Sequence, residues 1–240
     1  MFEMKIHKAI IHRVSNRFGF RTITLKTGAP LVFDPGQYIL ASVDTGQDDP
    51  IPCALFLEST DNNEVSICSP SPERWIPGRP ISFRGPLGHG FRISQLLRRM
   101  LLIGLDAHPG RLMSMVQAGI VMKADVVIAG DFTSDPQITK DIPPLVELAS
   151  LDRLSELFDW ADFVGVDVPL ERIQYLGELL PEKGSRMMKG NIQVLVHASM
   201  PCGGIAECGI CSVRTKRGYK LACQDGPVFD LADLSLSSFS

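Results

Sequence analysis

Four cysteines near the C-terminus constrain this chain more than any other feature. Cys202, Cys208, Cys211 and Cys223 follow one another as Cys-x5-Cys-x2-Cys-x11-Cys, and only two other cysteines occur among the 240 residues. The Cys-x2-Cys step places two sulfur atoms on one tight turn, and nearby glycines let the backbone approach a bulky ligand closely. Four thiols in so short a segment indicate the ligand set of a metal centre.

The spacing favours an iron–sulfur cluster. Plant-type [2Fe–2S] loops have Cys-x4-Cys-x2-Cys with a distant fourth Cys, and this chain has one more residue in the first interval. A structural zinc site is an alternative, but it usually draws on two close pairs of cysteines, and Cys202 and Cys223 have no such near partner. Disulfides or redox thiols are the least favoured, because we find no signal-peptide pattern and expect a reducing, cytoplasmic location.

The rest of the composition is that of an ordinary globular protein. The formal net charge is −3, with 45% hydrophobic and 21% charged residues. No basic stripe accompanies an aromatic platform, so we expect no nucleic-acid partner. The longest apolar runs are far shorter than the roughly 20 residues of a membrane span, so we expect no membrane insertion.

Residues 1–95 are predicted to form a β-barrel. Short runs rich in β-branched residues alternate with Pro, Gly, Asn and Asp clusters at nearly regular intervals, a pattern typical of a barrel or sandwich. The turn residues Asp34-Pro35-Gly36 favour the same interpretation. The predicted strands are Thr22–Leu25, Tyr38–Val43, Leu55–Glu58, Val65–Cys68 and Ile81–Phe83.

Residues 96–198 are predicted to form an α/β domain with a parallel sheet, because apolar runs there alternate with stretches of helical periodicity. Residues 199–240 follow as a cysteine-rich iron–sulfur segment. The predicted strands are Leu101–Gly104, Ala124–Ala129, Phe163–Val166 and Ile192–His197, and the predicted helices are Leu112–Met122, Leu151–Phe158 and Leu170–Leu180.

Five short motifs occur in a fixed order over nearly the full length: Pro35-Gly36-Gln37-Tyr38, Gly85-Pro86-Leu87-Gly88-His89-Gly90-Phe91, Met200-Pro201-Cys202-Gly203, Cys208-Gly209-Ile210-Cys211 and Cys223-Gln224-Asp225-Gly226-Pro227-Val228-Phe229-Asp230. Together with the predicted domain order, they resemble the ferredoxin–NADP reductase superfamily. Within it, the chain is similar to the electron-transfer subunits of dihydroorotate dehydrogenase.

The resemblance implies a chain of electron carriers. In that family an FAD lies against the barrel, NADH binds the α/β domain, and electrons pass through a [2Fe–2S] cluster to a separate flavoprotein catalytic subunit. It implies cluster ligands at Cys202, Cys208, Cys211 and Cys223, with one residue inserted between the first two. Glycines 203 and 204 tolerate unusual backbone angles and are expected to absorb this insertion. We expect no catalytic residue in the chain itself.

The flavin motif is only partly present. The family has Arg-Pro-x-Ser, in which Arg donates hydrogen bonds to the FAD pyrophosphate and Ser bonds the flavin region. If Pro52 matches the family proline, Ile51 replaces the Arg and Ala54 replaces the Ser. Pro52 is thus the one FAD-site residue that carries over, and FAD is expected mainly on the resemblance.

The nicotinamide motif departs further from the family. A glycine-rich turn lets backbone amides approach the pyrophosphate there, whereas Leu105 and Asp106 follow Gly104 here. Asp106 would bring a negative charge near a phosphate, and His108 is interpreted as a solvated loop residue. The later Cys-Gly-Pro element reads Gly165-Val166-Asp167-Val168-Pro169 and lacks its thiol. We predict weak or no NADH binding.

Three functions stay open at this point. The first is an electron-transfer subunit with a [2Fe–2S] cluster and FAD, docked on a flavoprotein partner that oxidises dihydroorotate in pyrimidine biosynthesis. The second is a degenerate paralogue that retains only the cluster, as a relay or structural partner. The third is a zinc-stabilised binding module, which only the cysteine count supports.

Overall fold

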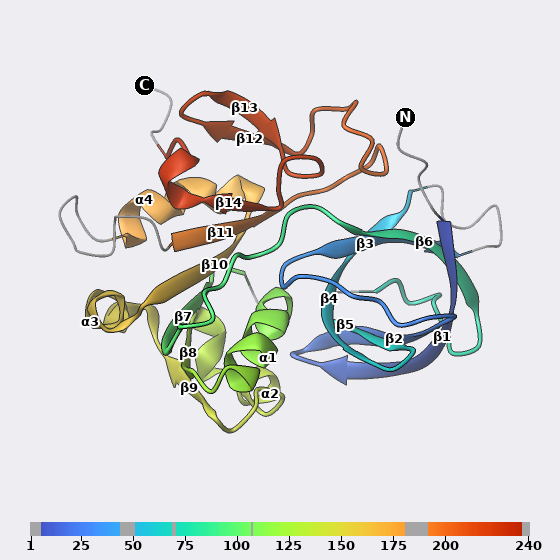
Figure 1. The fold of residues 1–240 in the computed structure, drawn as a ribbon, viewed down its shortest axis with the longest axis horizontal. Coiled ribbons are helices and arrows are strands. Elements are labelled where there is room, and N and C mark those ends of the chain that lie inside the picture. The colour runs from blue at the N-terminus through green and yellow to red at the C-terminus, as the bar shows by residue number, and fades with distance from the viewer. Residues whose placement is uncertain (1–5, 44–50, 69–70, 107, 181–191, 237–240) are drawn as a thin grey trace.

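The computed structural model describes residues 6–43, 51–68, 71–106, 108–180 and 192–236, which form two large sheets and a C-terminal segment that contains a small two-stranded sheet and contacts both (Figure 1). The first sheet is a closed antiparallel barrel in the order β1-β2-β5-β4-β3-β6. Its strands are β1 (Ile6–Arg17), β2 (Phe20–Thr27), β3 (Tyr38–Val43), β4 (Cys53–Asp61), β5 (Glu64–Ile67) and β6 (Pro80–Leu87).

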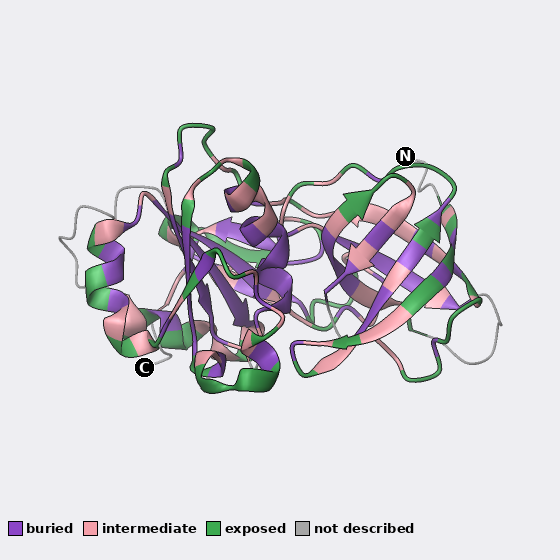
Figure 2. Ribbon diagram, turned by 90° about the horizontal axis from the view of Figure 1, so that it is seen from below, coloured by how far each residue is buried: buried purple, intermediate pink, exposed green. Residues whose placement is uncertain are grey.

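Period-two alternation builds the barrel interior, as the checkered burial in Figure 2 shows. Ile39 and Ala41 of β3 pack inside the barrel, whereas Tyr38 and Leu40 of the same strand belong to the second core, shared with the α/β domain. Both faces of β3 are therefore buried. This strand joins the two domains because each set of alternate side chains has its own core.

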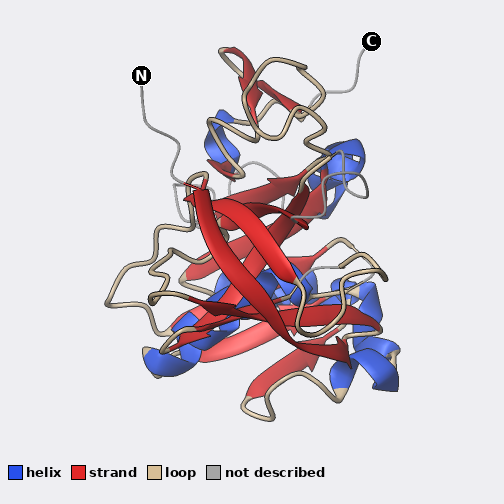
Figure 3. Ribbon diagram, turned by 90° about the vertical axis from the view of Figure 1, so that its right-hand side faces the viewer, coloured by secondary structure: helices blue, strands red, loops and turns tan. Residues whose placement is uncertain are grey.

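The second sheet has the order β14-β11-β10-β7-β8-β9, parallel except for β14. In Figure 1, α1 and α2 lie on the side of this sheet next to the barrel, and α3 lies on the other side; Figure 3 shows the helices flanking the strands. The strands are β7 (Arg99–Gly104), β8 (Asp125–Ala129), β9 (Val146–Ala149), β10 (Phe163–Pro169), β11 (Ile192–His197) and β14 (Val228–Asp230). The helices are α1 (Met113–Val121), α2 (Pro136–Thr139), α3 (Leu154–Trp160) and α4 (Leu176–Leu179).

The predicted fold class is confirmed, and all predicted strands are present. The predicted helix at 170–180 is a 3₁₀ helix over Leu170–Tyr175 followed by the short α4. Five strands were not predicted: β1 and the short β9, β12 (Ser212–Thr215), β13 (Gly218–Leu221) and β14. Because β14 lies within residues 199–240 and pairs with β11, the cysteine-rich segment ends inside the α/β sheet. The division at residues 95 and 198 stays a proposal.

None of the helices in the described part of the chain is both long enough and apolar enough to pass through a membrane.

Candidate functional site

A small hairpin brings the last two cysteines together. Cys211 directly precedes β12 (Ser212–Thr215), and Cys223 lies two residues after β13 (Gly218–Leu221). These strands pair antiparallel, and the amide of Ala222 donates to the carbonyl of Cys211 at 2.9 Å. Eleven intervening residues therefore fold back on themselves. Both thiols are buried, at 1% and 6% exposure for Cys211 and Cys223.

The four thiols interact as two pairs. Amides of the 205–208 loop, that of Cys208 foremost, hydrogen-bond the Cys202 sulfur, and these bonds together with the Cys208 side chain lower the pKa of Cys202 to about 6. Burial, followed by the neighbouring Cys211 thiol, raises the pKa of Cys223 to about 12. The charges of Cys202 and Cys211 both act on Cys223, so the two pairs are close to one another.

The loop backbone turns its amides toward these sulfurs. Gly203, Gly204, Ala206 and Gly209 all have positive φ, between 64° and 71°. Successive residues in such conformations form a concave nest of N–H groups, which binds anions. Cys202 and Cys223 both receive backbone hydrogen bonds from residues 205–208. Cys202 lies at one end of this nest, so the thiolate of Cys202 is stabilised here before any metal is considered.

A [2Fe–2S] cluster needs two thiolates on each of its two irons, and the donor set fits that demand. The pairs Cys202–Cys208 and Cys211–Cys223 supply two sulfurs each, and the amides supply hydrogen bonds to sulfur. Across the residues that the structure describes, no group of three or more His, Cys, Asp or Glu side chains is arranged to hold a single metal ion.

The cysteine loop packs against strands β3 and β6 of the barrel. Tyr38 on β3 donates its hydroxyl hydrogen to the carbonyl of Cys223 at 3.2 Å. Arg84 on β6 donates from Nη2 to the carbonyl of Gly203. A Cβ on Gly204 would lie 2.6 Å from Leu40 Cδ1, so a side chain at this position would displace Leu40 of β3. The predicted role of the two glycines in accommodating the insertion agrees with their positive φ and with this close approach.

A cleft with a volume of about 550 Å³ separates the start of β4 from the end of β11. Its barrel wall is the place where the sequence predicts the FAD site. Ile51 and Ala54 line it and offer no side-chain hydrogen bond, as the sequence indicated. Pro52 also lines the cleft and contacts the cysteine loop, since a Cβ on Gly203 would lie 3.2 Å from Pro52 Cγ.

The far wall of the cleft holds a buried ionic cluster that we call the Arg111 cluster: Arg111, Asp106, Asp167 and His197. Arg111 Nε donates to both carboxylate oxygens of Asp167 at 3.0 and 3.1 Å, and Nη2 donates to Asp106 and to His197 Nε2. Arg111 is 5% and Asp167 0% exposed. Asp106 thus pairs with the guanidinium of Arg111. From the sequence its negative charge was expected to lie near a phosphate, whereas in the structure this charge faces a cation of the same chain.

The Arg111 cluster lies where doubly wound sheets bind ligands. The strand order reverses between β7 and β10, and ligands of such folds bind outside the carboxyl ends of the strands at this point. Asp106 follows β7, Asp167 lies near the end of β10, and His197 ends β11. With one guanidinium facing two carboxylates, the described residues around the cleft do not form a positive site for a pyrophosphate. The residues present therefore do not fit FAD as a whole, although the volume and Phe56 fit an aromatic ring.

His197, which belongs to this cluster, and His108, which lies beside it, both favour their neutral form. Burial, then the charge of Arg111, lowers the pKa of His108 to about 4 and that of His197 to about 3. The His108 ring packs on Phe20 with centroids 4.1 Å apart. The prediction of a solvated loop histidine is therefore wrong, because the loop folds against the barrel.

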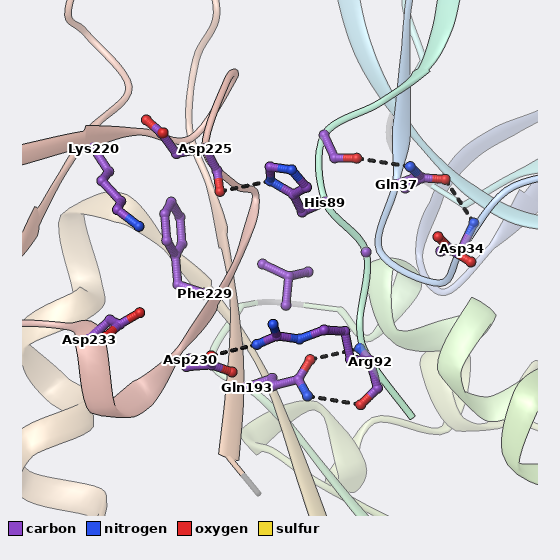
Figure 4. A pocket seen from close by; sticks show the side chains of 13 residues that line it. Asp34, Gln37, His89, Arg92, Gln193, Lys220, Asp225, Phe229, Asp230 and Asp233 are labelled. Carbon is purple, nitrogen blue, oxygen red and sulfur yellow. Dashed lines mark hydrogen bonds and ion pairs between the residues drawn. The ribbon is translucent and has the colours of Figure 1, made fainter. Parts of the chain in front are cut away.

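A second cavity of about 400 Å³ lies where the barrel, the linker after β6 and the C-terminal segment meet (Figure 4). His89 Nδ1 lies 3.0 Å from the carbonyl of Asp225, and Arg92 pairs with Asp230. The Gln193 side chain bonds both the amide and the carbonyl of Arg92, at 2.8 and 2.9 Å. The His89 contact joins the GPLGHGF and QDGPVFD motifs, which are far apart in the sequence.

The sequence identified all four cysteines as candidate ligands, but it did not identify Arg84, Arg111 or Tyr38 as residues that contact the site. An arginine in a sequence reads as an exposed charge, and no local pattern distinguishes the buried ones. Tyr38 lay inside a predicted motif, but nothing showed that its hydroxyl faces a segment 185 residues away.

Comparisons with known proteins match this geometry. Residues 197–235 match the family model for the iron–sulfur cluster binding domain of dihydroorotate dehydrogenase B. The electron transfer subunit of dihydroorotate dehydrogenase B (NAD(+)) from Clostridium perfringens is 25% identical over 167 residues, 66% of this chain and 68% of that protein. The corresponding subunit from Clostridium acetobutylicum is 22% identical over 169 residues, 67% of each chain.

Solved structures show the same fold. The structure of an NADH-dependent reduced ferredoxin-NADP oxidoreductase superposes with a TM-score of 0.72 at 16% identity, over 98% of this chain and 92% of that one. The ferredoxin reductase of carbazole 1,9a-dioxygenase gives a TM-score of 0.63 at 17% identity, over 80% and 69%. The chain therefore has a ferredoxin reductase-like fold, and its predicted resemblance to dihydroorotate dehydrogenase electron-transfer subunits is confirmed.

Proposed function

We propose that this chain is the iron–sulfur electron-transfer subunit of a dihydroorotate dehydrogenase-type complex. The single observation that carries the proposal is the two thiol pairs, Cys202–Cys208 and Cys211–Cys223, in a loop whose amides bond the sulfurs. The match of residues 197–235 to an iron–sulfur binding domain supports the same conclusion.

We infer a [2Fe–2S] cluster on these four cysteines. Such a cluster exchanges one electron at a time, and its potential depends on net charge, hydrogen bonds to sulfur and solvent exposure. Cys208 is exposed, whereas Cys211 and Cys223 are buried. The exposed side is therefore the side on which a partner can approach the sulfurs most closely, and Ile205 and Ile210 flank it at 45% and 55% exposure.

The proposed partner is a flavoprotein catalytic subunit in a hetero-oligomer, as the names of the clostridial relatives imply for those proteins. FAD within this chain has the support of the fold, but Ile51, Ala54 and the Arg111 cluster do not supply a pyrophosphate site. We therefore base no step on a flavin here. The same residues favour a second candidate, a relay that keeps the cluster without either nucleotide site.

One preparation tests these functions. The protein is purified without oxygen, and iron, acid-labile sulfide, zinc and flavin are measured per chain with the visible spectrum. We expect about two irons and two sulfides. Zinc without sulfide would exclude the cluster and both electron-transfer candidates. Flavin at about one per chain would favour the first candidate, and its absence the relay.

Two variants then test the ligand assignment. Cys211→Ser removes a proposed ligand and should abolish sulfide binding, whereas Cys53→Ser changes a half-buried cysteine outside the loop and should retain it. Equal iron and sulfide in both variants would show that Cys211 is not a ligand. Purification from native lysate, with identification of the co-purifying flavoprotein, tests the partner.

A further inference from the structure

Arg84 is a barrel residue that reaches the cysteine loop. It lies on β6 opposite Leu40 of β3, the residue against which Gly204 packs. Its Nη2 donates to the carbonyl of Gly203, which follows the proposed ligand Cys202 directly. A Cβ on Gly203 would lie 3.3 Å from the same Nη2 and 3.2 Å from Pro52 Cγ. The guanidinium, Pro52 and the Gly203 backbone are thus in mutual contact.

The charge of Arg84 acts in the same space as the thiols. Tyr38, whose hydroxyl bonds the carbonyl of Cys223, experiences the charges of Cys223, Cys211, Cys202 and Arg84 together. Arg84 is half-buried, so water screens its charge less than it would screen a surface arginine. The guanidinium also remains charged under all ordinary conditions.

We propose that Arg84 is a positioning residue that holds the Gly203 turn on the barrel and, through its fixed positive charge, raises the reduction potential of the cluster. Reduction adds one negative charge to the cluster, and a nearby cation stabilises that added charge. The inference rests on the proposed function, because it assumes that a cluster binds the four cysteines. It goes beyond that function by assigning the tuning of the cluster to a residue of the barrel domain.

Gly203 and Gly204 lie close to the barrel at the point where Arg84 contacts the loop. Both have positive φ, and their lack of a side chain lets β3 and β6 approach the loop between Cys202 and Cys208. The carbonyl of Gly203, which lies in this interval, is thereby within reach of a barrel arginine.

The test is the midpoint potential, measured by a redox titration followed by visible absorption and EPR on the full chain. Arg84→Met removes the charge and the donors, Arg84→Gln removes the charge but keeps a donor, and Arg84→Lys keeps the charge. Arg13→Met is the matched control, since it removes one charge from a side chain 63% exposed and paired with Glu64 on another part of the barrel. We expect the Met and Gln variants to shift to more negative potential and the Lys and Arg13 variants to stay near wild type.

The possible failures are distinguishable. Wild-type protein without iron and sulfide would overturn the proposed function and this inference with it. Wild-type protein with its full cluster and an unchanged potential in Arg84→Met and Arg84→Gln would overturn only the tuning role. Loss of the cluster from both variants, with an unchanged far-ultraviolet circular dichroism spectrum, would support the holding of the Gly203 turn by Arg84.

Discussion

The hydroxyl of Tyr38 donates a hydrogen bond to the carbonyl of Cys223, 3.2 Å away and 185 residues later in the chain. Tyr38 is fully buried, and burial raises its pKa, with the Cys223 thiol as the next cause. The bond links β3 of the barrel to Cys223, the last of the four predicted ligands. The cysteine loop is therefore supported by the barrel as well as by its own hairpin.

Replacement of Tyr38 by Phe should weaken this support. The change keeps the ring and leaves a buried carbonyl without its partner, which costs about 1–3 kcal/mol of unfolding free energy. Urea denaturation measures the loss, and the rate at which iron leaves the protein should rise with it. Tyr219→Phe, on a side chain 67% exposed, is the control and should change neither quantity. Equal stability of the two variants would show that the bond contributes nothing.

Gly204→Ala should disturb the loop at its closest approach to the barrel. Gly204 has φ of 71°, which costs a side-chain-bearing residue about 1–2 kcal/mol, and its new Cβ would meet Leu40 Cδ1 at 2.6 Å. We expect lower stability and less iron per chain. The matched control is Gly28→Ala, because a Cβ there meets open space.

A double variant separates strain from clash at the same position. Leu40→Ala removes the methyl group that the new Cβ would meet, so Gly204→Ala should cost less in the Leu40→Ala background than in the wild type. Additive costs would mean that backbone strain alone opposes the alanine.

Arg111→Met should be among the most destabilising single changes in the α/β domain. It leaves Asp167, which is fully buried, and Asp106 without their cation, and loss of one partner of a buried pair costs about 3–5 kcal/mol. Asp167→Asn in the same chain should recover part of the loss. Arg153→Met breaks only exposed pairs and should change the urea midpoint little. A comparable loss in both single variants would contradict the importance of burial.

Stability should fall as the pH falls from about 6.5 toward 4. Folding lowers the pKa of His108 to about 4 and that of His197 to about 3, so in this window the unfolded chain binds protons that the native chain does not. The raised pKa of buried Asp167 acts in the opposite direction. Denaturation measured at several pH values in this range gives the slope of stability against pH.

His108→Asn should reduce that slope, by up to about 1.4 kcal/mol per pH unit for one proton. The exposed pair of His12 with Glu64 provides the control, and His12→Gln should leave the slope in place. An unchanged slope in His108→Asn would show that His108 titrates alike in both states.

Local sequence patterns were enough to predict the candidate ligands and most of the strands of this protein. The spacing of Cys202, Cys208, Cys211 and Cys223 indicated a cluster, because ligands on one turn and one hairpin are close for reasons of chain length. Short β-branched runs between turn residues predicted most of the barrel, and apolar runs between stretches of helical periodicity predicted most of the parallel sheet. The short strands β9 and β14 were missed, since four and three residues hold too little pattern to distinguish them from loops.

Contacts between distant segments decided the rest. That Tyr38 and Arg84 face the cysteine loop, that Arg111 draws Asp106, Asp167 and His197 into one buried cluster, and that His108 is neutral are consequences of how the barrel packs on the α/β domain. The sequence by itself determined which atoms are available as ligands, because spacing is a local property of the chain. The tertiary structure decided their environment, because burial and the charges that surround a group depend on residues that meet only when the domains are folded together.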